Sequence, residues 1–319
     1  MKTIKEYTLY LENILKEYHF PDTPSNLYEP LTYFLSLGGK RIRPLLTLMS
    51  VEMFGGNKQD ALPSSLAIEF FHNFSLIHDD IMDCAPLRRN QLTIHSKWNN
   101  SIAILSGDVL LVKAYQELQK QDVKHLGHLL AIFNRTAVEV CEGQQMDMDF
   151  ESRNDVSVEE YIEMIRLKTS VLLGAALEMG AVIANADEEQ QKLIYDFGQY
   201  LGIAFQIQDD ILDLYGDPEK FGKQVGGDII SNKKTYLLLR ATEKQTNNEI
   251  DELLSIENTT LKVEKAQKLI RDLGVFDDAN QLKNNYHSKA MEALSKINVQ
   301  DEYKQALFDL SDFLFNREV

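Results

Sequence analysis

Apolar residues recur at spacings of three and four along most of the chain, which is the period of an amphipathic α-helix. Two runs show this spacing clearly: Tyr7, Leu11, Ile14 and Leu15, and Leu126, Leu129, Leu130 and Phe133. Strict alternation of apolar and polar residues, which is typical of strands, is rare, and the Asn-Gly pair that favours tight hairpins is absent. The pattern therefore predicts an all-α protein of roughly ten or more helices.

No low-complexity linker divides the chain, so we predict a single helical domain over residues 1–319. Residues 243–262 are polar, and they fit either a mobile loop or a solvated helix hairpin. The hydrophobic fraction of 44% in 319 residues is enough for a large buried core.

Charge and cysteine content narrow the class of protein. The formal net charge of −16 argues against a nucleic-acid-binding protein, which needs a basic surface against phosphates. The two cysteines, Cys84 and Cys141, cannot form a disulfide framework and fit a reducing cytosol. The N-terminal residues lack the apolar run of a secretory signal, and no window of about eighteen apolar residues is present. We therefore expect a cytoplasmic protein without a transmembrane segment.

Two similar segments carry the pattern Asp-Asp-x-x-Asp. The first holds Asp79, Asp80 and Asp83, and the second holds Asp209, Asp210 and Asp213. On a helix, residues four apart lie on one face, so the first and last aspartate of each segment point the same way and repel each other. Apolar neighbours make this arrangement costlier unless cations compensate. The pair of segments therefore predicts bound cations, and a solvated acidic helix end is the alternative for either segment alone.

Carboxylate oxygens are hard ligands, which favour magnesium, calcium or manganese over zinc. Magnesium usually completes its shell with water and substrate phosphates, so two such helices facing each other would form a magnesium site for a diphosphate. Basic residues occur in three groups: Lys40, Arg41 and Arg43 after Gly38-Gly39, then Arg88 and Arg89 just after the first cluster, then Lys223, Lys233 and Lys234 after the second. Arginine and lysine bind phosphate oxygens well, and ordinary surface salt bridges are the alternative for any one run.

His72 lies on the same predicted helical stripe as Asp79 and Asp83. It is either a helix histidine satisfied by its neighbours or a polar group of the site, about two turns from the first cluster. Gln206 and Asp209 share a similar stripe in the second segment.

At these residues the sequence resembles the trans-isoprenyl diphosphate synthases, the family of the farnesyl and geranylgeranyl diphosphate synthases. The similarity runs from Gly38 to about Leu238. Its motifs in chain order are Asp79-Asp80-x-x-Asp83 with Arg88-Arg89, Gly107-Asp108-x-Leu110-Leu111, Gly143-Gln144-x-x-Asp147, Lys168-Thr169, Phe205-Gln206-x-x-Asp209-Asp210-x-x-Asp213, Gly222-Lys223, Gly227-Asp228 and Lys233-Lys234-Thr235.

The resemblance implies an all-α bundle around a deep central cavity, usually a homodimer. It also implies the joining of isopentenyl diphosphate to an allylic diphosphate, namely dimethylallyl, geranyl or farnesyl diphosphate. About two or three magnesium ions would bind Asp79, Asp83 and Asp209, with Asp80, Asp210 and Asp213 completing the catalytic clusters. Isopentenyl diphosphate would bind Lys40, Arg43, His72 and Arg89. The allylic diphosphate would bind Arg88, Lys168, Lys223 and Lys233, and the cationic carbon would lie beside Thr169 and Gln206.

The sequence departs from the family pattern at two places. Residues 90–93 read Asn-Gln-Leu-Thr where Gly-x-Pro-Thr is common, which leaves the conformation of that loop open. Cys84 stands where a small polar residue is usual, and we expect a buried small apolar side chain there.

Two phenylalanines before the first cluster bear on product length. The resemblance implies that bulky residues at these places form a floor that stops chain growth. Phe74 lies five residues before Asp79 and Phe71 eight before, and the two-residue insertion of many bacterial farnesyl enzymes is missing. We therefore expect a product of fifteen or twenty carbons, with twenty favoured. The alternative is that both rings only pack the core.

Three other functions fit part of the pattern. A terpene cyclase or head-to-head synthase of the same architecture would also ionise allylic diphosphates, but it would not need Lys40, Arg43 and His72. A metal phosphohydrolase would use His78 beside the first cluster, although the second segment has Gln208 at that place. A non-catalytic partner subunit of a prenyl synthase would be expected to have lost its aspartates.

Overall fold

The computed structural model describes residues 3–216 and 225–315, and nearly all regular structure in these ranges is helical, which confirms the prediction of an all-α fold. The elements before residue 120 are α1 (Ile4–Glu17), α2 (Ser25–Ser36), α3 (Ile42–Met53), α4 (Lys58–Met82), β1 (Leu87–Arg88), β2 (Gln91–Leu92), α5 (Ile94–Lys97) and α6 (Asn100–Leu118). Those up to residue 216 are α7 (Val123–Ser152), α8 (Val158–Ile165), the π-helix η1 (Arg166–Ser170), α9 (Val171–Ile183) and α10 (Glu188–Tyr215). Those after residue 225 are α12 (Gly227–Ile230), α13 (Tyr236–Lys244), α14 (Glu249–Leu254), α15 (Thr259–Asp272), α16 (Val275–Lys296) and α17 (Asp301–Phe315).

The chain forms two compact units, each with its own core. The first comprises residues 1–134, 175–192 and 298–307, and the second comprises residues 135–174, 193–297 and 308–319. The first aspartate cluster lies in the first unit, and the second cluster lies in the second unit. The single domain over residues 1–319 stays a prediction.

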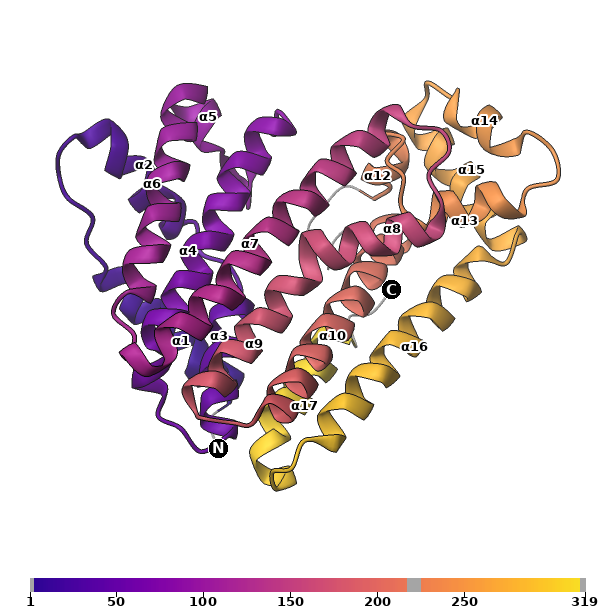
Figure 1. Cartoon of the computed structure of the whole chain (residues 1–319). Helices are drawn as coiled ribbons and strands as arrows, with labels where there is room; N and C mark the ends of the chain where they lie inside the picture. Colours follow the sequence, from indigo (N-terminus) through magenta and orange to yellow (C-terminus); the bar gives the residue numbers. More distant parts are fainter. Residues whose placement is uncertain (1–2, 217–224, 316–319) are drawn as a thin grey trace. The chain divides into compact units, whose positions relative to one another are not determined.

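α4 is the central element of the first unit, where it packs against α3 and α6 (Figure 1). Its contact with α6 depends on Gly107, because a Cβ at that position would lie only 2.4 Å from Nε2 of His78. The imidazole of His78 is held in place by two neighbours. Its Nε2 lies 3.2 Å from the carbonyl oxygen of Ile104, and its ring centroid lies 4.7 Å from that of Phe74. Tight packing of α4 therefore fixes the positions of the residues between His72 and Asp83.

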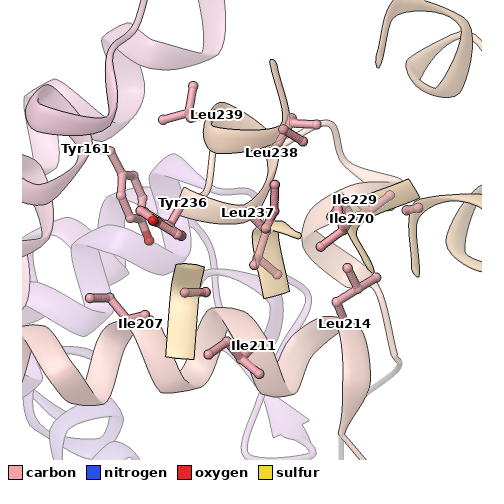
Figure 2. Packing of buried hydrophobic residues seen from close by; sticks show 14 of the residues in the cluster. Tyr161, Ile207, Ile211, Leu214, Ile229, Tyr236, Leu237, Leu238, Leu239 and Ile270 are labelled. Carbon is pink, nitrogen blue, oxygen red and sulfur yellow. The ribbon is translucent and has the colours of Figure 1, made fainter. Parts of the chain in front are cut away.

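A cluster of buried apolar side chains forms the core of the second unit (Figure 2). α10 contributes Ile207 and Ile211, and α13 contributes Leu237. Tyr161 of α8 and Tyr236 of α13 lie near each other in the same cluster, as Figure 2 shows. This packing fixes the part of α10 that carries the second aspartate cluster.

The loop between β1 and β2 has a defined conformation. Arg89 and Asn90 both have positive φ, 53° and 60°, and the flanking strands pair antiparallel. Two central residues with φ > 0 are the mark of a type I′ hairpin turn, in which asparagine is favoured. Asn90 therefore suits the turn that follows the first cluster.

The polar stretch 243–262 is mostly helical, because it spans the end of α13, all of α14 and the start of α15. Of the two predictions for this stretch, the structure therefore agrees with helices and not with a long mobile loop. Across residues 3–216 and 225–315, no helix has both the length and the hydropathy of a membrane span.

Candidate active site

Arg43 and His72 form a close pair in the first unit. The Nη1 of Arg43 lies 3.0 Å from Nε2 of His72, which joins the start of α3 to the middle of α4. Burial and then the charge of Arg43 hold the pKa of His72 well below its ordinary value of 6.5, so the imidazole is neutral and Nε2 can accept from the guanidinium. The Nε of Arg43 is buried and makes no hydrogen bond within the described part of the chain. Burial also lowers the pKa of Arg43 to about 10.

Arg41 has a different environment from its neighbours Lys40 and Arg43. It is 6% exposed, with its guanidinium bound to the carboxylate of Glu69 and to the carbonyl oxygen of Leu35. Lys40, by contrast, is exposed. For Arg41 the ordinary salt bridge is therefore the correct interpretation, and its role is to anchor the start of α3 on α4.

Arg89 approaches the Gly38-Gly39 turn. Its Nη1 donates to the carbonyl oxygen of Gly38, and a Cβ on Gly39 would lie 2.7 Å from the guanidinium carbon. Burial and then the nearby charge of Arg41 lower the pKa of Arg89. The glycine at position 39 thus allows a second arginine to lie close to the predicted isopentenyl diphosphate residues.

In the first aspartate cluster, the middle aspartate is held by an arginine. Asp80 is 2% exposed and accepts from Nε of Arg88 at 2.8 and 2.9 Å, while Nη2 of Arg88 lies 3.7 Å from Oδ2 of Asp79. Burial raises the pKa of Asp80, and Arg88 counteracts this rise. Asp79 is partly buried and Asp83 is exposed at the end of α4.

His78 does not join the cluster. Its Nε2 faces the carbonyl oxygen of Ile104 and lies 3.7 Å from the carboxylate of Asp108, both on α6. This orientation argues against the phosphohydrolase interpretation, which needs His78 as a ligand. Within the described residues, no three His, Cys, Asp or Glu side chains form a metal site by themselves. Magnesium is commonly bound by one or two carboxylates together with substrate phosphates, so an all-carboxylate donor set spread along a helix still fits it.

In the second cluster, the middle aspartate is held by uncharged donors. Asp210 is 4% exposed and accepts from the hydroxyl of Tyr161 at 2.5 Å, from Nε2 of Gln206 at 3.3 Å and from the backbone N–H of Tyr236 at 3.4 Å. Burial and then the charge of Asp228 raise the pKa of Asp210 to about 8. The sequence did not single out Tyr161, because its distance of 49 residues from Asp210 gives no local signal.

Asp213 is hydrogen-bonded to the start of α12. Its Oδ2 accepts from the backbone N–H of Asp228 at 3.0 Å, and its carbonyl oxygen accepts from the N–H of Gly226 at 2.6 Å. The Gly227-Asp228 motif thus borders the second cluster directly. Lys223 lies outside the described residues.

Two of the predicted diphosphate lysines converge on one carboxylate. Oδ2 of Asp147 lies 2.7 Å from Nζ of Lys168 and 3.4 Å from Nζ of Lys233. Burial opposes the charge on Asp147, but Lys233 and Lys168 outweigh it and hold its pKa below the ordinary value. Asp147 belongs to a family motif for which the sequence predicted no role, and here it positions both lysines.

Lys168 and Thr169 sit in the π-helix η1, a widened turn of a kind that is frequent at functional sites. Two glycines make room for it. A Cβ on Gly143 would lie 2.3 Å from the backbone nitrogen of Lys168, and a Cβ on Gly202 would lie 2.8 Å from Cα of Ser170. Helices α7 and α10 can therefore approach η1 closely, and the periodicity of the sequence gave no sign of this turn.

Phe71 and Phe74 belong to a row of aromatic rings. The centroids of Phe71 and Phe74 are 5.8 Å apart, Phe71 lies 5.4 Å from Phe133, and Phe133 lies 5.0 Å from Tyr115. Phe71 is 1% exposed, whereas Phe74 is partly buried. The packing is compatible with a floor under a growing chain and also with a plain core.

Cys84 is exposed, so the expectation of a buried side chain was wrong. It directly follows the C-cap residue Asp83 and has φ of 50°, the left-handed conformation that commonly ends a helix. This turn directs the chain out of α4 and leaves the thiol at the surface.

The model of the polyprenyl synthetase family matches residues 24–273. This chain belongs to that family. It is 36% identical to the short chain isoprenyl diphosphate synthase of Methanothermobacter thermautotrophicus, over 100% of this chain and 98% of that protein. It is also 36% identical to the geranylgeranyl diphosphate synthase of Methanosarcina mazei, over 92% of this chain and 91% of that protein. Among solved structures, a geranylgeranyl pyrophosphate synthase is similar over 100% of both chains, with 45% identity and a TM-score of 0.93. The predicted family is thus confirmed.

Proposed function

We propose that the protein is a short-chain trans-prenyltransferase that condenses isopentenyl diphosphate with allylic diphosphates to give geranylgeranyl or farnesyl diphosphate. The observation that carries the proposal is the pair of Arg43 and neutral His72. The buried Nε of Arg43 makes no hydrogen bond within the described residues, so an incoming diphosphate oxygen would satisfy it. A terpene cyclase has no use for such an isopentenyl diphosphate site.

Isopentenyl diphosphate would bind Arg43 and His72 together with Lys40 and Arg89. The allylic diphosphate would bind Lys168 and Lys233, with Arg88 and Lys223. These groups are amines and guanidiniums of the kind that neutralise phosphate oxygens. Because Asp147 already holds Lys168 and Lys233 near each other, little rearrangement of these two side chains is needed.

Magnesium would be held by Asp79, Asp83 and Asp209, and when bound it supplies positive charge against the departing diphosphate. Asp80 and Asp210 are buried and engaged by protein groups, so we assign them to positioning the two clusters. Asp213 would position the start of α12 through its hydrogen bond with the backbone N–H of Asp228.

Cleavage of the allylic carbon–oxygen bond leaves its electron pair on the diphosphate, where Lys168, Lys233 and Arg88 bind the developing charge. Thr169 lies in the wide η1 turn, and we place Thr169 and Gln206 beside the carbocation. Arg43 and His72 hold the diphosphate group of isopentenyl diphosphate, which places its double bond for attack on this carbon, and this is a proximity effect. The adduct then loses a proton to the released pyrophosphate, and the product is five carbons longer. Water must be excluded, because it would convert the cation to an alcohol.

For product length we propose that Phe71 and Phe74 form the floor, which favours twenty carbons. The partly buried Phe74 ring is the nearer of the two to Asp79 along α4. Phe133 supports Phe71 from α7.

We also propose a cytoplasmic homodimer. The support is a face of α6 on which Ile104, Leu105 and Val112 are 46, 56 and 55% exposed. Three large apolar residues on one helical face mark an association surface. Leu105→Glu should convert the dimer to a monomer in size-exclusion chromatography with light scattering. Val123→Glu, at an exposed site on α7, is the control and should stay dimeric.

The activity test incubates the purified protein with isopentenyl diphosphate and each allylic diphosphate, with and without magnesium, and identifies products by mass spectrometry. We expect a longer prenyl diphosphate only when magnesium is present. Asp79→Ala and Asp209→Ala should each lower turnover sharply and keep the circular dichroism of the wild type. A cyclic hydrocarbon from an allylic diphosphate alone would instead indicate a cyclase, and no turnover with any starter would favour a partner subunit.

A further inference from the structure

The two aspartate clusters stabilise their middle carboxyl groups by different means. Asp80 has an arginine partner, because Nε and Nη2 of Arg88 lie 2.8 Å from its Oδ1. Asp210 is as deeply buried, yet the donors that the described residues direct at it are the hydroxyl of Tyr161, the amide of Gln206 and a backbone N–H. A buried carboxyl group without a cationic partner depends strongly on its hydrogen bonds.

Among these donors, Tyr161 makes the shortest contact. Its hydroxyl lies 2.5 Å from Oδ2 of Asp210, against 3.3 Å for Gln206 and 3.4 Å for the N–H of Tyr236. The ring of Tyr161 is 2% exposed and packs in the apolar cluster of the second unit, so its hydroxyl has a fixed direction (Figure 2). Tyr161 is therefore the main hydrogen-bonding anchor of Asp210.

The position of Tyr161 in the chain adds to this role. It lies on α8, which begins with a capping box between Ser157 and Glu160 and continues directly into η1. η1 carries Lys168, one of the proposed ligands of the allylic diphosphate. One hydrogen bond thus links the helix with the second aspartate cluster to the segment that carries this lysine.

We propose that Tyr161 is a positioning residue for the allylic diphosphate and its magnesium. Through Asp210 it sets the rotation of α10, which directs Asp209, and it fixes α10 relative to the segment that holds Lys168. The inference rests on the proposed function and adds a specific residue to it. Arg43 and His72 belong to the first unit, whereas Tyr161 and Asp210 belong to the second, so we expect loss of this bond to leave isopentenyl diphosphate binding unchanged.

The test replaces Tyr161 by phenylalanine, which keeps the ring and removes only the hydroxyl. The first readout is binding of inorganic pyrophosphate in the presence of magnesium, measured by calorimetry without turnover. Loss of one hydrogen bond to a buried carboxyl is expected to weaken this binding about tenfold. The second readout is kinetic: the KM for the allylic diphosphate should rise by a similar factor, while the KM for isopentenyl diphosphate should stay within twofold of the wild type.

Tyr215→Phe is the matched control. The hydroxyl of Tyr215 also donates a hydrogen bond in the second unit, at 2.9 Å, but its acceptor is the backbone carbonyl of Gln267 and not an aspartate. This variant should keep both KM values and the pyrophosphate affinity within twofold of the wild type. A similar loss in both variants would mean a general loosening of the core and would overturn the proposal.

A double-mutant cycle separates action through Asp210 from independent packing. In an Asp210→Ala background, Tyr161→Phe should change pyrophosphate binding less than twofold, because its acceptor is gone. An undiminished tenfold effect would overturn the proposal, and so would unchanged binding in Tyr161→Phe alone. If wild-type protein bound no pyrophosphate with magnesium, the proposed function itself would fail, and this inference with it.

Discussion

Replacing Gly143 by alanine is expected to displace the π-helical turn that carries Lys168 and Thr169. The added Cβ would lie 2.3 Å from the backbone nitrogen of Lys168 and 2.7 Å from its Cα. Ordinary contacts of a Cβ begin at 3.4 Å, so the two backbones must separate by about 1.1 Å, the difference between 3.4 and 2.3 Å. A backbone cannot swing aside as the end of a side chain can.

The expected loss follows from two opposing contributions. Overpacking of a tight contact costs about 1–3 kcal/mol. Alanine in place of glycine inside a helix returns about 0.5–1 kcal/mol. The free energy of unfolding should therefore fall by about 0–2.5 kcal/mol, with the middle of the range at about 1 kcal/mol. Turnover should suffer more, because a displacement of about 1 Å at a substrate-binding group can cost on the order of a hundredfold in rate.

Gly127 provides the matched control, because it lies on the same helix and has nothing within 4 Å of the added Cβ. Gly127→Ala should raise the free energy of unfolding by about 0.5–1 kcal/mol and leave turnover unchanged. The assay is urea denaturation of both variants, together with kcat/KM for the allylic diphosphate. Equal stabilisation by Gly143→Ala and Gly127→Ala would refute this reasoning. It would mean that the close approach of α7 to η1 does not require glycine at position 143.

Two further predictions concern α4. Phe74→Ala should shift the product toward longer prenyl chains in mass spectrometry, because it removes a ring from the proposed floor; an unchanged chain length would refute that role. His72 should make the free energy of unfolding decrease at low pH, because its pKa in the folded protein lies below 6.5. The stabilisation by neutral His72 is complete above about pH 6.5 and is lost as pH falls through the folded-state pKa. His72→Gln should flatten this loss in denaturation measured from pH 7 to pH 5, whereas exposed His19→Gln should not. Equal slopes in wild type and His72→Gln would contradict a neutral imidazole with a lowered pKa.

The sequence predicted the features that depend on local periodicity or on residue type. The spacing of apolar residues gave the helices, and two Asp-Asp-x-x-Asp segments pointed to the family that the comparisons confirm. The pairing of His72 with Arg43 also fits the predicted group, although their contact required the packing of α3 on α4.

Features that depend on distant partners were out of reach. Arg41 and Arg43 look alike in the sequence. In the structure, Arg41 forms a salt bridge with Glu69, whereas Arg43 contacts His72. Asp147 gathers two lysines from different parts of the chain. The widened turn η1 lies where the backbones of α7 and α10 approach it closely, and the spacing of hydrophobic residues does not predict such a contact.

The close packing of Gly107, His78 and Phe74 has a consequence for engineering the enzyme. A side chain at position 107 would meet the imidazole of His78 at once, and that imidazole rests against the Phe74 ring. The three positions therefore constrain the order in which mutations can accumulate. In a library aimed at new product lengths, a larger residue at position 107 would be tolerated only after the residue at position 78 or 74 has become smaller. The same substitution at position 107 would therefore be harmful early in a series of mutations and harmless later.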